Sequence, residues 1–433
     1  MKIAVIGTGY VGLVSGACFS EFGHTVTCVD KDAGKINRLL DGIMPIYEPG
    51  LDSLVERNTA AGRLFFTTDL EKAMDGAEAV FIAVGTPSRR GDGHADLQYV
   101  FAAVEELAVY IKAYTVIVTK STVPVGTGAA IKKRVSALVS DDLFGIASNP
   151  EFLREGAAIE DFMRPDRVVV GIECDQAKTV MQELYRPLFL SETPVVFTNR
   201  ETAEIIKYAA NAFLATKISF INEMADLCEK VGADVRQVAK GIGLDNRIGG
   251  KFLHAGPGFG GSCFPKDTRA LVQSAETYDV PMKIVRSVVE VNEERKLAMA
   301  GKIVQACGGS VENKHIALLG LTFKPNTDDM RESPSLDIIS KLQALGAEIH
   351  AHDPKGMEEA AEMLTDIHFH DDPYSAMEGA DALVIVTEWN QFRALDLNRV
   401  HELLAHPVLV DLRNIYGSVD MAALGFDYSG IGR

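Results

Sequence analysis

Short apolar runs alternate with helical patterns along the first 120 residues of the chain. Residues 2–7 form a β-branched run, and small and apolar residues then recur at helical spacing as far as Phe22. Near-continuous apolar strands separated by helices are typical of a parallel sheet that is covered on both faces. The pattern therefore predicts an α/β fold that begins with a doubly wound parallel sheet. Its later apolar runs occupy residues 25–29, 79–84 and 115–119.

The same pattern returns towards the C-terminus. Three segments repeat earlier ones in the same order: 315–320 repeat 2–7, 346–353 repeat 23–30, and 379–385 repeat 76–82. This order indicates a second doubly wound, Rossmann-like domain. Its first turn, residues 320–325, lacks the three-glycine pattern of residues 7–12. We therefore do not expect the second domain to hold a dinucleotide in the ordinary way.

A stretch without proline or glycine, residues 201–231, lies between the two repeats. Gly232 is a typical helix stop, and Thr198 with Glu201 fits a capping box at the start. About 30 residues make a helix of ~45 Å, which we expect to join the two sheets and to offer a dimer surface. Residues 233–300 are also predicted to be mainly helical, around a glycine-rich loop at 249–261. The predicted domains are an N-terminal Rossmann domain (1–198), the long helix with a helical dimerisation domain (199–305) and a C-terminal Rossmann-like domain (306–433).

Charge and hydropathy narrow the class of protein. The 433 residues include 43 Lys and Arg against 60 Asp and Glu, a formal net charge of -17. This balance argues against a nucleic-acid partner, because neutralising phosphates requires a basic face. No apolar run approaches the ~18 residues of a membrane helix, and the apolar start ends at Gly7, too soon for a signal peptide. We expect a soluble, cytoplasmic protein without a membrane partner.

The six cysteines form no CxxC pair, so we expect neither a disulfide framework nor a metal site. Cys263 alone has unusual surroundings, a loop with four glycines and two prolines over residues 256–267. Glycines let a substrate lie against the backbone, Lys266 can help lower the pKa of a thiol from ~8.5, and Asp267 adds a carboxylate. A thiolate near a dinucleotide suggests a covalent carbonyl adduct from which a hydride can leave.

A dinucleotide is indicated by Gly7-x-Gly9-x-x-Gly12, which follows a predicted strand and opens a predicted helix. The glycines let the backbone approach a pyrophosphate at the helix N-terminus. Asp30, at the end of the second predicted strand, can bond both ribose hydroxyls and repels a 2'-phosphate. The sequence therefore predicts NAD as the cofactor in preference to NADP.

Two loops follow further predicted strands of this sheet. Residues 85–87, with Thr86, and residues 121–124, with Thr122, come after apolar runs. Ligands of open parallel sheets bind beyond the carboxyl ends of the strands, so we expect both loops to face the cofactor.

Polar residues interrupt two otherwise apolar segments. Lys207 and Asn211 are four residues apart on the predicted long helix and share one face. A cation and an amide among apolar neighbours must be paired or point into a site, where they can stabilise an oxyanion. Residues 148–156 place Glu151 and Glu155 after another apolar run, either as helix-opening acids or as site carboxylates.

In combination these residues resemble the UDP-glucose/GDP-mannose dehydrogenase family, over almost the whole chain. The resemblance rests on the glycine fingerprint, residues 121–124, Asn149 to Leu153, the Lys207/Asn211 helix, Gly260 to Asp267, and residues 323–334 from Phe323 to Pro334. It implies oxidation of a nucleotide sugar at C6 from alcohol to acid with two NAD and one water. It also implies that the C-terminal domain holds the UDP end, and the run 252–256 with Phe264 is similar to members that use UDP-glucose.

The resemblance also implies roles for single residues. Cys263 is the expected nucleophile, Lys207 and Asn211 polarise the C6 oxygen, Asp267 and Thr122 arrange water, and Glu151 transfers protons during thioester hydrolysis. The expected cofactor contacts, beyond the three glycines, are Tyr10, Val11, Asp30, Lys35, Thr86, Thr122, Glu155, Lys266 and Arg331. The expected substrate contacts, beyond Glu151, Lys207 and Asn211, are Phe152, Leu153, Arg154, Glu155, Phe252, Leu253, His254, Ala255, Gly256, Gly260 and Lys324.

Two alternatives stay open. GDP-mannose and UDP-N-acetylmannosamine dehydrogenases share the architecture, and choice among similar sugars can rest on ~1 to 3 kcal/mol of pocket fit. A silent nucleotide-sugar sensor that uses NAD only as a structural ligand is an alternative of another class, although the joint presence of Cys263, Lys207, Asn211 and Asp267 argues against it. The partners expected are UDP-glucose and a second copy of the chain.

Overall fold

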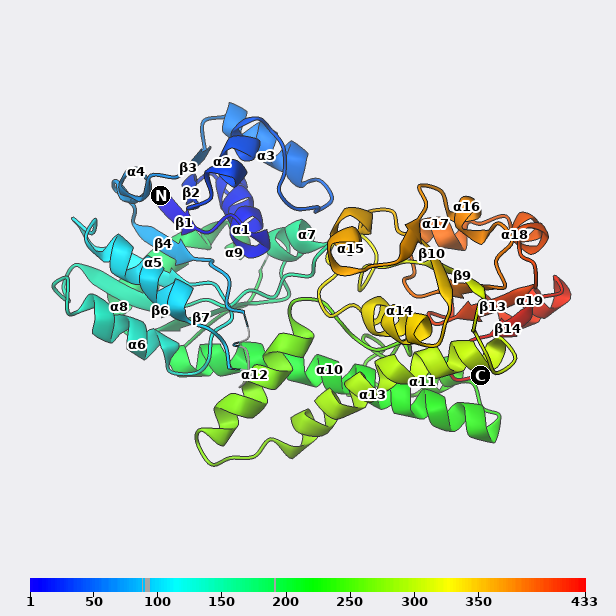
Figure 1. Cartoon of the computed structure of the whole chain (residues 1–433). Coiled ribbons are helices and arrows are strands. Elements are labelled where there is room, and N and C mark those ends of the chain that lie inside the picture. Colours follow the sequence, from blue (N-terminus) through cyan, green and yellow to red (C-terminus); the bar gives the residue numbers. More distant parts are fainter. Residues whose placement is uncertain (88, 90–93, 191) are drawn as a thin grey trace. The chain divides into compact units, whose positions relative to one another are not determined.

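The computed structural model describes residues 1–87, 89, 94–190 and 192–433, and strands alternate with helices through most of them (Figure 1). The chain divides into two compact units. One comprises residues 1–210 and 273–280, and the other residues 211–272 and 281–433. Each unit contains one sheet, which confirms the predicted α/β class with two Rossmann-like sheets and a helical middle region.

The sheet of the first unit has the strand order β3-β2-β1-β4-β5-β6-β7-β8. All neighbours in it are parallel except β6 and β7. The strands are β1 (Lys2–Ile6), β2 (Thr25–Val29), β3 (Leu64–Thr67), β4 (Ala79–Ile82), β5 (Thr115–Thr119), β6 (Phe144–Ser148), β7 (Val168–Ile172) and β8 (Val195–Thr198).

Helices cover both faces of this sheet, which explains its near-continuous apolar strands. Val5 packs on one side with Phe19 of α1, whereas Ile6 packs on the other with Val104 of α5. The helices of the region are α1 (Tyr10–Glu21), α2 (Ala33–Leu40), α3 (Leu51–Ala60), α4 (Leu70–Met74), α5 (Gln98–Ala108), α6 (Thr127–Val135), α7 (Ala158–Met163), α8 (Asp175–Leu184) and α9 (Arg186–Phe189).

The sheet of the second unit is parallel throughout, in the order β11-β10-β9-β12-β13-β14. Its strands are β9 (His315–Leu319), β10 (Glu348–His352), β11 (Ile367–Phe369), β12 (Ala382–Ile385), β13 (Val408–Asp411) and β14 (Asp427–Ser429). The helices that follow α10 (Arg200–Val231) are α11 (Val235–Gly243), α12 (Phe264–Glu276), α13 (Lys283–Ala306), α14 (Pro334–Ala344), α15 (Met357–Met363), α16 (Pro373–Met377), α17 (Asn390–Arg393), α18 (Leu397–Leu403) and α19 (Ser418–Ala423).

The predicted long helix is α10 (Arg200–Val231), drawn in green in Figure 1. The capping box predicted at its start is wrong. Thr198 is the last residue of β8, and the side-chain oxygen of Asn199 accepts from the backbone N–H of Thr202 at 2.8 Å. Because the strand continues through Thr198, the next polar residue caps the helix. At the other end Gly232 has φ +74°, as the stop prediction requires.

In both sheets the strand order reverses direction beside the first strand, since β1 lies between β2 and β4 and β9 lies between β10 and β12. Ligands of such sheets bind beyond the carboxyl ends of the strands at this point. Among the described residues, no helix combines the length and the apolar composition needed to cross a bilayer.

Candidate active site

The turn after β1 leaves the backbone open where a pyrophosphate would lie. Gly7 has φ +101° and donates to the carbonyl of Val29 at 2.8 Å, and a Cβ there would stand 2.7 Å from the carbonyl oxygen of Ala83. A Cβ on Gly12 would collide with the carbonyl oxygen of Gly7. Around the position of a Cβ on Gly9 there is open space within 4 Å. The first and third glycines therefore form the tight turn into α1, and the second leaves room for the ligand.

Asp30 follows β2 and faces this turn. One carboxylate oxygen accepts from the backbone N–H and the hydroxyl of Thr8, both at 2.8 Å, and the other accepts from the N–H of Asp32 at 3.0 Å. Burial by itself would raise the pKa of Asp30, but these hydrogen bonds and the charge of Lys35 outweigh it and lower the pKa. Asp30 is thus ionised and half-buried, which suits a ribose diol and opposes a 2'-phosphate.

The loops after β4 and β5 are tied together at the same end of the sheet. The hydroxyl of Thr86 donates to the carbonyl of Thr122 at 3.0 Å, and that of Ser121 donates to the carbonyl of Val84 at 2.7 Å. Thr122 also lines a small pocket that Pro150 and Lys207 border. The structure therefore brings together Thr86, Thr122 and Lys207, which are far apart in the sequence.

A buried ion pair stands at this pocket. The ammonium of Lys207 lies 3.0 Å from a carboxylate oxygen of Glu151, and the side chains are 4% and 5% exposed. Desolvation would raise the pKa of Glu151, but the charge of Lys207, the N–H of Leu153 at 2.6 Å and the charge of Lys120 lower it. Glu151 is consequently a carboxylate, held beside the ammonium of Lys207.

The segment after Glu151 is fixed by its own contacts. The guanidinium of Arg167 lies 3.6 Å from the ring centre of Phe152, and Arg154 pairs with Asp161 through two nitrogens. Tyr10 at the start of α1 accepts from the N–H of Gly156 at 3.2 Å. Three residues expected at the cofactor or the substrate, Tyr10, Phe152 and Arg154, are therefore ordered from within this unit.

Lys120, which lies directly after β5, was not predicted from the sequence. Its ammonium donates to the side-chain oxygen of Asn149 at 3.1 Å and to the hydroxyl of Tyr185 at 3.3 Å. Full burial lowers the pKa of Lys120 to about 8. Lys120 and Asn149 therefore join β5 to the loop that carries Glu151. The signal in the sequence was a lysine directly after a five-residue apolar strand.

Glu204, one turn before Lys207 on α10, was also missed. It is 3% exposed and accepts from the N–H groups of Gly126 and Gly128 at 2.7 and 2.8 Å and from the hydroxyl of Ser148 at 3.2 Å. Burial raises the pKa of Glu204 despite these bonds. A carboxylate at the N-terminus of α6 satisfies unpaired N–H groups, and it also fixes the rotation of α10 that aims Lys207 at the pocket.

In the second unit, Asn211 and Asp267 meet. The side-chain N–H of Asn211 donates to Asp267 at 2.7 Å, and the ammonium of Lys266 lies 2.9 Å from the other oxygen of Asp267. Asp267 is 1% exposed. Cys263 directly precedes α12, which places it at the positive end of the helix dipole and favours its thiolate. Asn211 of α10 thus forms one polar cluster with Lys266 and Asp267, which lie in the first turn of the helix that Cys263 precedes.

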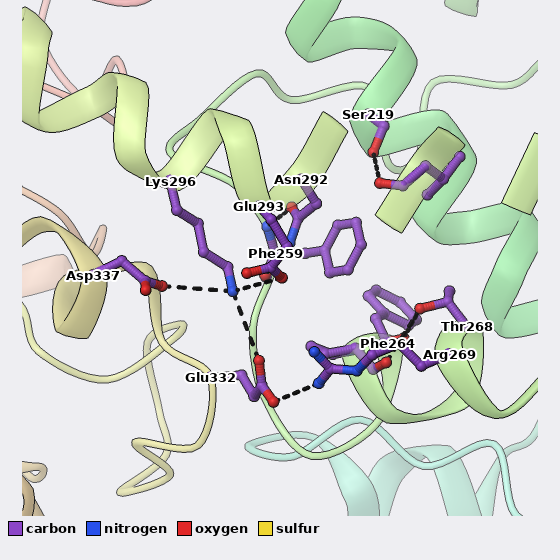
Figure 2. A network of polar contacts seen from close by, with 12 residues as sticks. Ser219, Phe259, Phe264, Thr268, Arg269, Asn292, Glu293, Lys296, Glu332 and Asp337 are labelled. Atoms are coloured by element: carbon purple, nitrogen blue, oxygen red, sulfur yellow. Dashed lines mark hydrogen bonds and ion pairs between the residues drawn. The ribbon is translucent and has the colours of Figure 1, made fainter. Parts of the chain in front are cut away.

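The loop before Cys263 is held by α13, as Figure 2 shows. The side-chain amide of Asn292 accepts from the N–H of Phe259 at 2.8 Å and donates to its carbonyl at 3.0 Å. Arg295 donates to the carbonyl of Gly256 at 3.0 Å. These residues were missed, although polar side chains at 292, 295 and 296 form one helix face at i, i+3 and i+4.

A buried lysine of α13 adds further contacts in the same region. Lys296 is 1% exposed, and its ammonium lies 3.2 Å from Glu293, 3.7 Å from Glu332 and 3.6 Å from Asp337. Glu332 in turn bonds Arg269 of α12, so that the dashed contacts of Figure 2 run from α13 to the helix that follows Cys263.

The loop after β9 packs against the cysteine loop within the same unit. The N–H of Gly261 donates to the carbonyl of Arg331 at 2.8 Å, and a Cβ on Gly260 would collide with the carbonyl oxygen of Glu332. The guanidinium of Arg331 binds Asp329, and Lys324 lies 5.2 Å from the ring centre of Phe323. The structure therefore brings the predicted substrate residues Gly260 and Lys324 into two loops that touch.

These parts define a class of protein. One unit has an open glycine turn with an ionised Asp30 and a buried lysine and carboxylate pair, and the other has a thiol before a helix that carries Asp267. Together these features define the class of an NAD-dependent dehydrogenase with a cysteine thiol among its functional residues.

Family comparisons extend this class. Residues 1–189 match the NAD binding domain of the UDP-glucose/GDP-mannose dehydrogenase family, residues 201–294 its central domain and residues 317–418 its UDP binding domain. The chain belongs to this family. It is an oxidoreductase with NAD as its cofactor, and the glycine-poor second sheet matches the UDP binding domain.

Relatives and solved structures agree with this assignment. The chain is 59% identical to a UDP-glucose 6-dehydrogenase of Rhizobium meliloti (strain 1021) over the full length of both chains. It is 50% identical to the UDP-glucose 6-dehydrogenase TuaD of Bacillus subtilis (strain 168), over all of this chain and 93% of that one. A UDP-glucose dehydrogenase structure from the archaeon Pyrobaculum islandicum matches with a TM-score of 0.91 and 38% identity, over 99% of this chain and 97% of that one.

Proposed function

We propose that the chain oxidises UDP-glucose at C6 to UDP-glucuronate, with two NAD reduced for each sugar. The observation that carries the proposal is the pairing of polar groups along α10, Lys207 with Glu151 and Asn211 with Asp267. The 59% identical relative named UDP-glucose 6-dehydrogenase supports the choice of sugar.

The chemistry proposed for Cys263 is covalent. Loss of a hydride and a proton turns the C6 alcohol into an aldehyde, and the thiolate of Cys263 adds to its carbon to form a C–S bond. Loss of a second hydride from the adduct leaves a thioester, and water then cleaves the C–S bond to give the carboxylate and the free thiol. NAD, when bound, accepts each hydride.

The buried polar residues are proposed to act on the oxygen and on the water. Lys207 and Asn211 stabilise the negative charge that develops on the C6 oxygen, because a buried cation and an amide are strong donors in a dry site. Asp267 and Thr122 hold the attacking water. Glu151, an ionised carboxylate beside Lys207, takes and returns a proton during thioester hydrolysis.

The remaining contacts follow the division of the chain. We propose that NAD lies on the glycine turn and Asp30, with help from Tyr10, Val11, Lys35, Thr86, Glu155, Lys266 and Arg331. The sugar nucleotide is proposed to contact the segments 151–155 and 252–256 together with Gly260 and Lys324. The positive φ of +65° at Phe252 supports a special role for the second segment, because a bulky residue there is strained.

Two other functions make different predictions. A GDP-mannose or UDP-N-acetylmannosamine 6-dehydrogenase would reduce NAD with its own sugar nucleotide and not with UDP-glucose. A sensor would bind the ligands without turnover. The decisive experiment mixes the chain and NAD with each sugar nucleotide and follows NADH absorbance. We expect two NADH and one UDP-glucuronate per UDP-glucose, with no aldehyde released to a carbonyl trap.

Cys263→Ser tests the covalent step. Serine is a far poorer nucleophile at neutral pH, so turnover from both the alcohol and a supplied aldehyde should fall by a factor of about 100 or more. Cys174→Ser is the matched control, since Cys174 is a free, exposed cysteine. Wild-type turnover by Cys263→Ser, with the normal two NADH, would refute the thioester route. It would not contradict the proposed NAD site.

Lys207→Ala tests the oxyanion. We expect kcat to fall by about a factor of 100, the scale of one lost oxyanion donor. Lys230→Ala, at the exposed end of the same helix, should leave kcat unchanged. Normal kcat per folded molecule for Lys207→Ala would make the buried pair with Glu151 purely structural.

We also propose a homodimer through α10. The exposed apolar side chains of this helix include a series at intervals of seven, seven and four residues: Phe213 (66%), Phe220 (46%), Leu227 (53%) and Val231 (66%). One stripe of this kind suits a second copy of the same helix. Phe220→Asp should halve the mass measured by light scattering, while Phe189→Asp, at a similarly exposed phenylalanine of α9, should not. A dimer that survives Phe213→Asp with Phe220→Asp would exclude this surface.

The proposed location is the cytoplasm. A catalytic thiol needs a reducing compartment, as the cytoplasm is.

A further inference from the structure

Histidines gather at the open edge of the second sheet, outside the site described above. The edge strand β11 pairs in parallel with β10, and His368 lies opposite His350. Glu348 is two residues before His350 on β10, and alternate residues of a strand point to the same face. Ile349 and Ala351 between and beyond them are fully buried on the other face. One face of this edge therefore carries a carboxylate and two imidazoles.

We propose that Glu348, His350 and His368 form a binding site for a divalent transition-metal ion of the zinc class. The proposal concerns a site that the oxidation of UDP-glucose does not use, and it stands independently of the proposed function.

The distances fit such an ion. The Nε2 atoms of His350 and His368 lie 3.1 and 3.2 Å from the same oxygen of Glu348, and all three donor atoms lie within 4.8 Å of one another. Ligands at about 2.0 to 2.1 Å from a tetrahedral zinc ion are about 3.3 Å apart. Two of the three distances between the ligand atoms are thus already close to this value, and the third is at most 4.8 Å.

A second layer of histidine orients the ligands. Nδ1 of His350 lies 2.9 Å from Nε2 of His370, which can accept the N–H that a metal-bound imidazole carries on its other nitrogen. If Nδ1 carries the proton, the lone pair of Nε2 faces the oxygen of Glu348, and a cation between them removes the repulsion. The metal therefore replaces the proton that otherwise bridges His350 and Glu348.

The imidazole rings at this edge of the sheet pack against one another. The ring of His350 lies 3.6 Å from that of His315 and 4.6 Å from that of His368, centre to centre. The two ligand imidazoles are therefore already held side by side, so that little conformational freedom is lost when both bind one ion.

The site is accessible, and it lies away from the catalytic loops. The side chains of Glu348 and His368 are 58% and 59% exposed, which lets an ion enter and leaves coordination positions for water. Glu348 is the first residue of β10, whereas the loop that carries Lys324 follows the last residue of β9. Since the ion would join β10 to the short edge strand β11, we expect it to stabilise the second sheet and not to affect oxidation of the sugar.

The test uses the full chain with Cys263→Ser, so that the active-site thiol does not bind the ion. After treatment with EDTA and dialysis, Zn²⁺ is added in a calorimeter. We expect one Zn²⁺ per chain and a higher melting temperature. Co²⁺ should give visible bands of a nitrogen and oxygen site without thiolate absorption.

Variants locate the site. Glu348→Gln and His368→Gln should each weaken Zn²⁺ binding by a factor of about 10 or more, and His370→Gln by a smaller factor. His406→Gln is the matched control, because His406 lies 3.8 Å from Asp381 and, among the described residues, belongs to no group of three donors. A melting temperature in EDTA equal to that of the parent chain shows that a variant folds normally. If one of the two ligand variants melts at a lower temperature, the Zn²⁺ affinity of the other is the test of the site. Unchanged affinity in both ligand variants, or no binding by the parent chain, overturns the proposal and leaves only a pair of histidines bound to a glutamate.

Discussion

The first turns of the two sheets begin alike and end differently. Gly7 and Gly320 have φ +101° and +89°, and their N–H groups donate to the strand alongside, to Val29 at 2.8 Å and to His352 at 2.9 Å. After Gly7 the chain enters α1 within three residues. After Gly320 it runs as a loop until α14 begins at Pro334. The second sheet thus keeps the turn and loses the helix N-terminus that would face a pyrophosphate.

The carboxylates at the end of the second strand show the same divergence. Asp30 accepts three hydrogen bonds and stays half-buried. Asp353 is 1% exposed and accepts six, among them those of Leu321 at 2.7 Å and of the indole N–H of Trp389 at 3.2 Å. The carboxylate of Asp30 is available to a ligand, whereas that of Asp353 is fully occupied by hydrogen bonds within the protein. The same topology therefore serves as a cofactor site in one sheet and as a support for a loop in the other.

Removing the buried acid should have the largest effect. Asp353→Ala leaves six donors without their acceptor, which should cost at least about 3 kcal/mol of stability in the second unit. Trp389 is the single tryptophan, so its fluorescence during urea unfolding reports on this site. Asp30→Ala should leave that unfolding curve unchanged. A small effect of Asp353→Ala would mean that water satisfies these donors and that the contrast is weaker than the geometry indicates.

The next largest effect is expected from a side chain at Gly9, the second glycine of the fingerprint. Gly9→Val meets open space in the ligand-free protein, so folding should be intact, but the valine occupies the space of the pyrophosphate. We expect NAD affinity to fall by about a factor of 100, with Gly9→Ala between this variant and the wild type, and UDP affinity to stay the same. The counterpart of Gly9 in the second sheet, Thr322, already carries a side chain. Normal NAD binding by Gly9→Val would show that the cofactor does not use this turn.

Cofactor preference should change by a smaller factor. Asp30 opposes a 2'-phosphate by about 2 kcal/mol or more, so Asp30→Ala should reduce the ratio of kcat/KM for NAD over NADP by about a factor of 30. Steady-state rates with both cofactors measure this ratio. Equal use of both cofactors by the wild type would contradict the assignment of Asp30.

The pH dependence of stability should give the smallest effect, with opposite signs in the two units. The pKa of Lys120 is lowered to about 8 by burial, so the unfolded chain binds more protons between pH 8 and about 10.5. Wild type should therefore gain stability relative to Lys120→Met as the pH rises through this window, by at most about 1.4 kcal/mol per pH unit. Calorimetric melting at pH 8 and 9 measures the difference.

Asp411, at the end of the fifth strand of the second sheet, provides the contrast. Burial raises its pKa, so wild type should lose stability relative to Asp411→Asn as the pH rises from below 4 through the pKa of the folded state. If the stability of wild type relative to the variant changed in the same direction with pH in both comparisons, groups other than Lys120 and Asp411 would dominate the pH dependence in these two pH ranges.

The sequence by itself determined the elements and the chemistry of their local motifs. The two strand repeats, the helix that ends at Gly232, the glycine turn and the acid at the end of the second strand depend on residues close together in the chain. Local patterns of this kind specify backbone geometry directly. They are the reason that the α/β class and NAD could be predicted.

Only the tertiary structure decided which polar groups meet. Glu151 and Lys207 are 56 residues apart, as are Asn211 and Asp267, and Phe259 and Asn292 are 33 apart. A buried polar group must find a partner, but sequence does not say which partner lies within about 3 Å. The helix cap shows the same limit at short range, because Asn199 serves instead of Thr198 once β8 extends to that residue. Asp353 has the same place in its repeat as Asp30, and only the structure shows that its carboxylate is used up by backbone N–H groups and by the indole of Trp389.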